Sequence, residues 1–348
     1  MGAARASVYA RADGNNMESP AMLARFTFVL ALVATVAPAR AADPLPLRYA
    51  QTASTWRSIF SLPMRVADKL GFFAKNDIAF TMVPIEEGAE ASLVALREGN
   101  ADVAHVATSF LVTAAMRGAD TVAIAAEFNN PVYSLVAKPW YKSIAELKGR
   151  RIGMADMTGS VSLATLALFE KHGVKKEDLN IRVIEGTSAR FQCLVNDDCE
   201  AVPLGQPQDF YAQRQGFRLL GATSEAVPEF LYTVTAARRG WAEQHQETLV
   251  RYVRAMRDSF KFIRDPENHG RLVLLMKDGW GSSEDSAFAT LDLFFKPERH
   301  VLPMEGEISM EGLERVIGFM RDGGVIAGAA PSLDQLVDTR YLKIGLGR

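Results

Sequence analysis

Short apolar runs alternate with helical patterns in the first half of the chain. Runs rich in β-branched and other apolar residues predict strands at residues 47–50, 79–85 and 101–106. Each run is followed by a stretch with helical spacing of apolar residues, at residues 61–70, 89–98 and 110–117. Strands that alternate with helices are typical of a mostly parallel sheet built from βαβ units. The pattern therefore predicts an α/β fold.

A second set of the same kind begins at residue 151. It has strands at residues 151–155, 180–184 and 200–204 and helices at 160–172 and 188–195. A shift of 98 positions places Glu87-Gly88 on Glu185-Gly186 and Ala101-Asp102 on Cys199-Glu200. We interpret this as an internal repeat, with generic βαβ similarity as the alternative. Either way we expect two lobes of one kind with a pocket between them, because open α/β sheets bind ligands outside the carboxyl ends of their strands.

The last third of the chain is predicted to be mainly helical. An apolar strand is expected at residues 231–236. Two apolar stripes at helical spacing follow, the first at Leu249, Val253, Met256, Phe260 and Ile263, the second at Leu313, Val316, Ile317 and Met320. Such stripes indicate helices that pack against the core.

The first forty residues have the pattern of a secretory signal. Arg25 precedes an apolar stretch at residues 26–36, and small residues around Ala41 form a cleavage site. An 11-residue run is too short to cross about 30 Å of hydrocarbon, which needs roughly 20 helical residues. We therefore expect residues 1–41 to be a cleaved signal peptide, with residues 1–21 a mis-assigned extension ahead of Met22. A buried N-terminal helix is the alternative.

Charge and composition do not alter the predicted fold class. The 39 Lys and Arg residues nearly balance the 41 Asp and Glu residues, as in an ordinary soluble protein. Nucleic-acid binding is set aside, because it requires a basic surplus that neutralises phosphates. No metal and no cofactor are predicted, and the mature protein is expected to be a monomer.

The two cysteines, Cys193 and Cys199, have two open interpretations. In an oxidising compartment they would form a disulfide that closes a short loop and stabilises the fold by about 2.5 kcal/mol. The alternative is a pair of small buried thiols. Neither cysteine follows the predicted cleavage site, so lipid attachment there is excluded.

Four stretches of the chain resemble a known family. Residues 47–50 (LRYA), 67–73 (ADKLGFF), 95–104 (ALREGNADVA) and 144–153 (IAELKGRRIG) are similar, in order and spacing, to blocks of one group of substrate-binding proteins. The group comprises the sulfonate, taurine, nitrate and thiamine-pyrimidine receptors and is called NMT1/THI5-like. Members deliver a small molecule to the permease and ATPase of an ABC importer, which implies a periplasmic location here.

The resemblance implies a type II periplasmic-binding-protein fold, with two lobes, each containing a mostly parallel sheet, joined by a two-strand hinge. The chain would cross between lobes near residues 127–136 and 223–233. Lobe one would then comprise residues 45–130 plus 232–348, and lobe two residues 131–231. A hinge of this kind lets the lobes close over a ligand.

Candidate ligand contacts lie where predicted strands end and helices begin. Thr158, Gly159 and Ser160 precede a helix whose free N–H groups favour a polar or anionic ligand, although a simple N-cap is the alternative. The other candidates occupy corresponding turns, and they are Thr52, Trp56, Gly88, Thr108, Ser109, Asn129 and Gln206.

Several of these positions have a structural alternative. Trp56 would stack on a flat ligand or pack against the lobe, and Asn129 would bind the ligand or shape the turn. His105, inside an apolar strand, is interpreted as a satisfied core residue. Arg57 and Arg190 are the cations nearest these turns, and neither is assigned to the ligand.

Two rival functions remain beside solute capture for import. A thiamine-pyrimidine synthase would resemble this family, but its cysteine-rich iron site has no counterpart in a chain with two cysteines. Hydrolase, zinc-protease and nucleotide-binding motifs are also absent, so no enzyme is expected. A binding protein that signals to a receptor kinase is the other rival. The ligand stays open among sulfonates, nitrate, pyrimidines and aromatic carboxylates.

Overall fold

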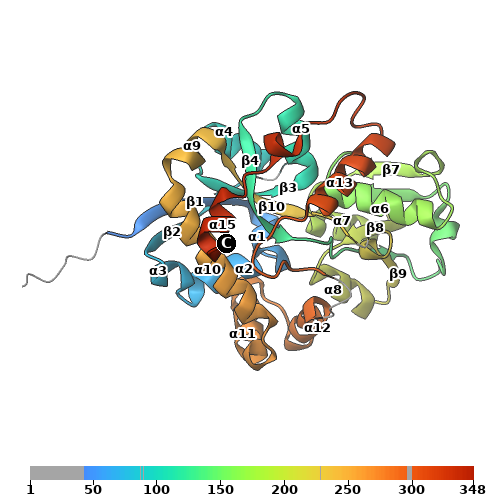
Figure 1. Cartoon of the computed structure of the whole chain (residues 1–348). Helices are drawn as coiled ribbons and strands as arrows, with labels where there is room; N and C mark the ends of the chain where they lie inside the picture. The colour runs from blue at the N-terminus through green and yellow to red at the C-terminus, as the bar shows by residue number, and fades with distance from the viewer. Residues whose placement is uncertain (1–42, 87, 89, 228, 296–299) are drawn as a thin grey trace, which may run out of the picture. The chain divides into compact units, whose positions relative to one another are not determined.

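The computed structural model describes residues 43–86, 88, 90–227, 229–295 and 300–348. The predicted signal peptide lies outside these residues. In the part described, the strands form two five-stranded sheets (Figure 1).

The first sheet has the strand order β2-β1-β3-β10-β4. Its strands are β1 (Leu45–Thr52), β2 (Ile78–Ile85), β3 (Val103–Ala107), β4 (Thr121–Phe128) and β10 (Thr233–Arg238). Only β10 runs antiparallel to its neighbours. All eight residues of β4 are buried, as expected for a strand covered on both faces.

The second sheet repeats this arrangement, with the order β7-β6-β8-β5-β9. Its strands are β5 (Ser134–Ala137), β6 (Arg151–Met154), β7 (Asn180–Val183), β8 (Ala201–Leu204) and β9 (Arg218–Ala222). Here β5 is the antiparallel strand. The predicted α/β class with two mostly parallel sheets is therefore confirmed.

Helices cover both sheets. Those nearest the strand ends are α1 (Ala53–Trp56), α2 (Leu62–Lys69), α4 (Ala91–Arg97), α5 (Thr108–Met116), α6 (Ser160–Lys171), α7 (Thr187–Val195) and α8 (Gln208–Arg214). The C-terminal part adds α9 (Arg239–Gln244), α10 (Gln246–Arg264), α11 (His269–Trp280), α12 (Glu284–Phe295), α13 (Met310–Asp322) and α15 (Arg340–Leu346). Both predicted apolar stripes, on α10 and α13, are buried.

The chain passes from the first sheet to the second through residues 129–133, between β4 and β5, and returns between β9 and β10. The strand predicted at residues 231–236 begins two residues late, at Thr233. The shift arises because Leu231 and Tyr232 belong to the returning segment, where the Tyr232 N–H donates to the Phe128 carbonyl at 3.0 Å.

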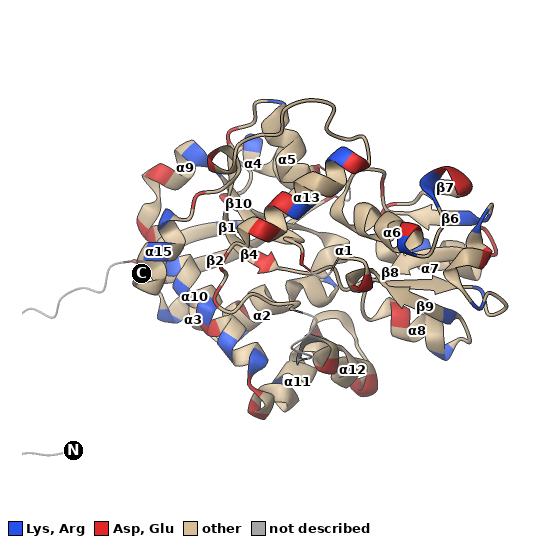
Figure 2. Ribbon diagram, turned by 45° about the vertical axis from the view of Figure 1, so that its right-hand side comes forward, with Lys and Arg blue, Asp and Glu red and all other residues tan. Residues whose placement is uncertain are grey.

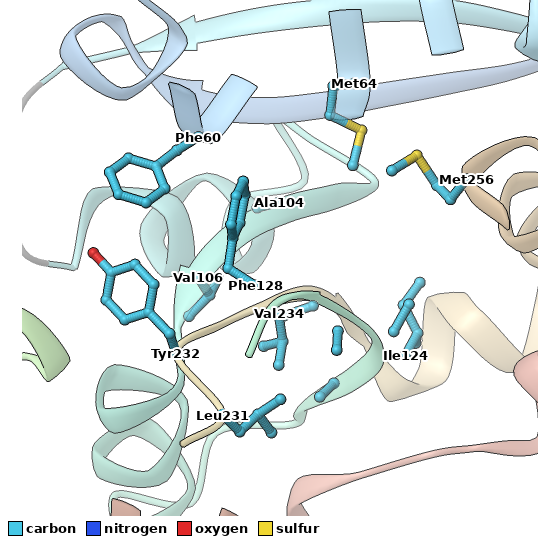
Figure 3. Close-up of a cluster of buried hydrophobic side chains, with 14 of the residues drawn as sticks. Phe60, Met64, Ala104, Val106, Ile124, Phe128, Leu231, Tyr232, Val234 and Met256 are labelled. Atoms are coloured by element: carbon cyan, nitrogen blue, oxygen red, sulfur yellow. The ribbon is translucent and has the colours of Figure 1, made fainter. Parts of the chain in front are cut away.

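An aromatic cluster ties both connecting segments to the first sheet. The Phe60 ring stacks on Tyr133 at 5.6 Å between centroids and lies 5.6 Å from Tyr232 and 5.2 Å from Phe128. Figure 3 shows Phe60, Phe128 and Tyr232 close together among buried aliphatic side chains. Tyr133 precedes β5 and Tyr232 precedes β10, so one ring contacts both connections.

Cys193 and Cys199 form a disulfide, with their Cα atoms 5.3 Å apart. It links the end of α7 to the residues before β8, within the second sheet's own core. Of the two interpretations open from the sequence, the structure contains the disulfide.

Candidate ligand-binding site

A cavity of about 160 Å³ lies at the carboxyl ends of strands from both sheets. On the first sheet, its wall includes Thr52 at the end of β1 and Ala107 at the end of β3. On the second sheet, it includes Asp156 after β6 and Thr187 after β7. This placement follows from the topology, because parallel strands bring their carboxyl ends to one edge of a sheet.

Tyr133 and Tyr232 belong to the two connecting segments, and both line the cavity. Their rings meet edge to face, with centroids 6.2 Å apart, and both side chains are nearly buried. Burial raises the pKa of Tyr232 well above its ordinary value, so its hydroxyl keeps its proton. The connection between the sheets is thus also part of the site.

Arg190 of α7 is the most unusual residue in the wall. Its side chain is only 2% exposed, and its guanidinium donates to the carbonyls of Pro203 at 3.0 Å and Ile184 at 3.1 Å, and to Thr187 Oγ1 at 3.1 Å. All three acceptors are neutral, and within the described ranges no carboxylate pairs with this guanidinium. Burial lowers the pKa of Arg190, and the nearby Tyr133, Tyr232 and Asp156 side chains only partly oppose this effect. A guanidinium has five N–H donors, so two remain for a ligand.

The Asp156 side chain lies at the loop before α6, where the sequence predicts contact with a polar or anionic ligand. One carboxylate oxygen accepts from the N–H of Thr158 at 2.8 Å and from the N–H of Gly159. Neither Thr158 nor Gly159 is among the residues that line the cavity. The protein's own carboxylate therefore uses the donors that sequence reasoning assigned to the ligand.

Ser109 and Ser160 contact each other instead of the cavity. Their hydroxyls are 3.2 Å apart, and the Ser109 N–H donates to Ser160 Oγ at 3.4 Å. Both side chains are buried, at the first turns of α5 and α6. This contact joins the elements around the first sheet to those around the second.

The remaining predicted residues differ in placement. Thr52 and Gly88 line the cavity, and the Thr52 side chain also caps α1. Thr108, Asn129 and Gln206 are not lining residues, although each has a buried side-chain oxygen without a hydrogen-bond partner in the described structure. Trp56 lies outside the lining and packs under Arg65, whose guanidinium carbon is 4.4 Å from the ring centroid.

Sequence reasoning did not assign most of the cavity wall to the ligand, and the missed residues include His105, Arg190, Tyr232 and Thr233. The hydroxyl of Thr233 is buried and has no hydrogen-bond partner among the described residues. A signal for His105 existed, since an imidazole in an otherwise apolar strand needs a polar partner. Arg190 follows the glycine of the repeated Glu-Gly pair by four residues, which places it on the first turns of a helix that starts at the cavity.

Asp209, in the first turn of α8, is expected to make stability depend on pH. The carboxylate is 1% exposed and accepts from Ser134 Oγ, Gln206 Nε2 and the Phe210 N–H, each at 2.8 Å. Burial outweighs these contacts and raises the pKa of Asp209 to about 6, from 3.8. The native carboxyl thus holds its proton more tightly than the unfolded one.

The resulting stabilisation is present below about pH 4 and is lost as pH rises through about 6. It corresponds to about 3 kcal/mol. Urea unfolding of wild type and Asp209→Asn between pH 4 and 7.5 measures it: the wild type should lose this stability relative to the variant as pH rises. Parallel pH profiles would contradict the assignment.

The described residues hold neither a candidate metal site nor a candidate membrane span. They contain no group of three or more His, Cys, Asp or Glu side chains arranged to hold a metal ion. They also include no helix with the length and apolar character required to span a bilayer. Acidic and basic residues both occur along α8 and α9 (Figure 2).

Comparison with known proteins gives a family match and a fold match. A family model described as NMT1/THI5 like matches residues 60–269, more than half of the chain. A provisionally named binding protein of Brucella abortus is 30% identical over 166 residues, which are 45% of this chain and 48% of that protein. The chain thus spans about half the length of the curated relatives it matches.

Solved structures with the same fold include binding proteins and an enzyme. A ligand-binding component of an ABC-type import system from Staphylococcus aureus is 12% identical, with a TM-score of 0.72 over 86% of this chain and 98% of that one. The alkanesulfonate-binding protein SsuA from Xanthomonas axonopodis pv. citri, bound to MOPS, is 16% identical, with a TM-score of 0.68 over 85% and 99%. The desulfurization enzyme DSZB is 15% identical, with a TM-score of 0.63 over 87% and 99%. These likenesses agree with the predicted periplasmic-binding-protein fold.

Proposed function

The chain belongs to the NMT1/THI5-like family, and from this premise we propose that it is a periplasmic solute-binding protein that delivers a small molecule to the permease and ATPase of an ABC importer. The observation that carries the proposal is the cavity at the strand ends of both sheets, with Tyr133 and Tyr232 of the connecting segments in its wall. A ligand held there contacts both halves at once.

We infer that the ligand is a small organic anion with a single ring. Arg190 is buried in the wall without a carboxylate partner among the described residues, and an unpaired buried charge is costly. An anion would pair with it through the two remaining N–H donors. A cavity of about 160 Å³ is close to the ~150 Å³ that accommodates benzene in an engineered protein. Tyr133 and Tyr232 supply aromatic contact for the ring.

Closure of the two halves would couple binding to delivery. In this proposal residues 45–130 plus 232–348 form one lobe and residues 131–231 the other, and the two connections act as the hinge. A ligand that contacts both lobes stabilises the closed state by its difference in affinity for the two states. The importer would then recognise the closed, monomeric protein. A receptor kinase would recognise the same closed state. A sensing role therefore requires the same physical properties of this chain as import does.

Thermal unfolding in the presence of small anions tests the proposal. Benzoate and benzenesulfonate are compared with the neutral analogue benzamide, and the probe is recovered afterwards. At 100 times its Kd, a bound anion should stabilise the protein by about 2.7 kcal/mol, while benzamide should have little effect. Equal shifts with benzamide would contradict an anion site. Conversion of the probe to a product would favour an enzyme, as in the fold relative DSZB.

A further inference from the structure

A buried polar network lies under the cavity on the first sheet. His105 of β3 lines the cavity, and its side chain is 10% exposed. Its Nδ1 hydrogen-bonds a carboxylate oxygen of Glu127 on β4, and the Glu127 side chain is 2% exposed. Thr235 belongs to β10, the antiparallel strand between β3 and β4, where it is the register partner of His105. Burying an ionisable pair in an apolar core costs desolvation free energy, so its presence beside the cavity indicates a functional role.

The second oxygen of Glu127 is held by two hydroxyl donors. Tyr49 Oη donates at 3.1 Å and Thr235 Oγ1 at 2.7 Å. Thr235 Oγ1 is also 2.6 Å from Tyr252 Oη. Burial and the charge of Glu127 raise the pKa values of Tyr49 and Tyr252 well above the ordinary range, so both hydroxyls keep their protons. These hydrogen bonds hold the Glu127 carboxylate in place as a hydrogen-bond acceptor for His105.

A carboxylate only accepts hydrogen bonds, so the imidazole must donate to it from Nδ1. In the uncharged ring the hydrogen then sits on Nδ1, and Nε2 has a free lone pair. The opposite tautomer would place two lone pairs against each other in a buried site. The geometry therefore selects one tautomer without any ligand.

We propose that Glu127 is a positioning residue that fixes the tautomer of His105, so that His105 Nε2 accepts a hydrogen bond from an O–H or N–H group of the ligand. This inference rests on the proposed function. It narrows the ligand to a single-ring anion with a hydroxyl or amino group apart from its acid group. Arg190, in the wall contributed by the second sheet, would bind the acid group, and His105, on the first sheet, the donor group.

The ligand-free protein gives the decisive measurement. Long-range ¹H–¹⁵N spectra of histidine-labelled wild type should show a protonated Nδ1 and an unprotonated Nε2 for His105, assigned by the loss of its signals in His105→Phe. In Glu127→Gln, the amide oxygen should stay with Tyr49 and Thr235, and the NH₂ group should face Nδ1. The tautomer should then reverse, which a purely structural role of Glu127 would not produce.

Ligand preference gives the second measurement, by calorimetry with 4-hydroxybenzoate and benzoate. Wild type should prefer 4-hydroxybenzoate by about tenfold, the effect of one hydrogen bond. Glu127→Gln and His105→Phe should lose this preference. His172→Phe, at an exposed position after α6, is the matched control and should retain it.

The outcomes separate the inference from the function on which it rests. A hydrogen on Nε2 of uncharged His105 in wild type, or an unchanged tautomer in a folded Glu127→Gln, overturns the role of Glu127. Equal affinity of wild type for both probes overturns the role of His105. If neither probe binds wild type, the proposed ligand class is overturned, and the spectra still decide the role of Glu127. The wild-type tautomer is read with His105→Phe alone as the assignment variant, so a failure of Glu127→Gln to fold leaves that measurement intact.

Discussion

Replacing Arg190 with methionine is expected to weaken binding of benzoate at least about 100-fold. Hydrogen bonds to a charged group contribute about 1.5–3 kcal/mol each, and the two free N–H donors can bind a carboxylate side by side. The water-poor surroundings strengthen the interaction, since Arg190 is only 2% exposed. Isothermal titration calorimetry on wild type and Arg190→Met measures the change in Kd.

Two further variants make the Arg190 result specific. Arg190→Lys keeps the positive charge but loses the planar fork of donors, so its Kd should lie between those of wild type and Arg190→Met. Arg182→Met, on the edge strand β7, removes a side chain that is 49% exposed and near Asp198, and its Kd should equal that of wild type. Circular dichroism checks that each variant is folded. An unchanged Kd in a folded Arg190→Met would contradict an anion site at this residue.

Much of the fold was predictable because its signals are local. Strand and helix periodicities depend on neighbouring residues, so the βαβ sets and the stripe from Leu249 to Ile263 appear where they were expected. Strands β4, β5 and β9 were not predicted. β5 and β9 have only four and five residues, and the place of all three strands in their sheets depends on pairing across long stretches of chain, between Ser134 and Leu204 for instance.

The site was harder to predict, because its chemistry depends on contacts between distant segments. A helix start at Ser160 is readable from sequence, but the use of its free N–H groups by Asp156 depends on the fold of the preceding loop. The partner of His105 is 22 positions away on a strand that is not its neighbour. Arg190 looks like a surface arginine until the carbonyls of Ile184 and Pro203 enclose its guanidinium.

Phe60→Ala is expected to lower the free energy of unfolding by about 4 kcal/mol, because removal of a buried Phe side chain typically costs ~3–5 kcal/mol. Phe60 is 3% exposed and contacts Tyr133, Tyr232 and Phe128, so its loss also removes aromatic pairs. Urea unfolding measures this, with Phe288→Ala as the control: Phe288 is 45% exposed and its replacement should change stability by less than ~0.5 kcal/mol. Because Phe60 packs against both connecting segments, Phe60→Ala should also weaken benzoate binding, by loosening the two tyrosines of the cavity wall. Equal unfolding free energies of the two variants would show that this cluster does not hold the connections in place.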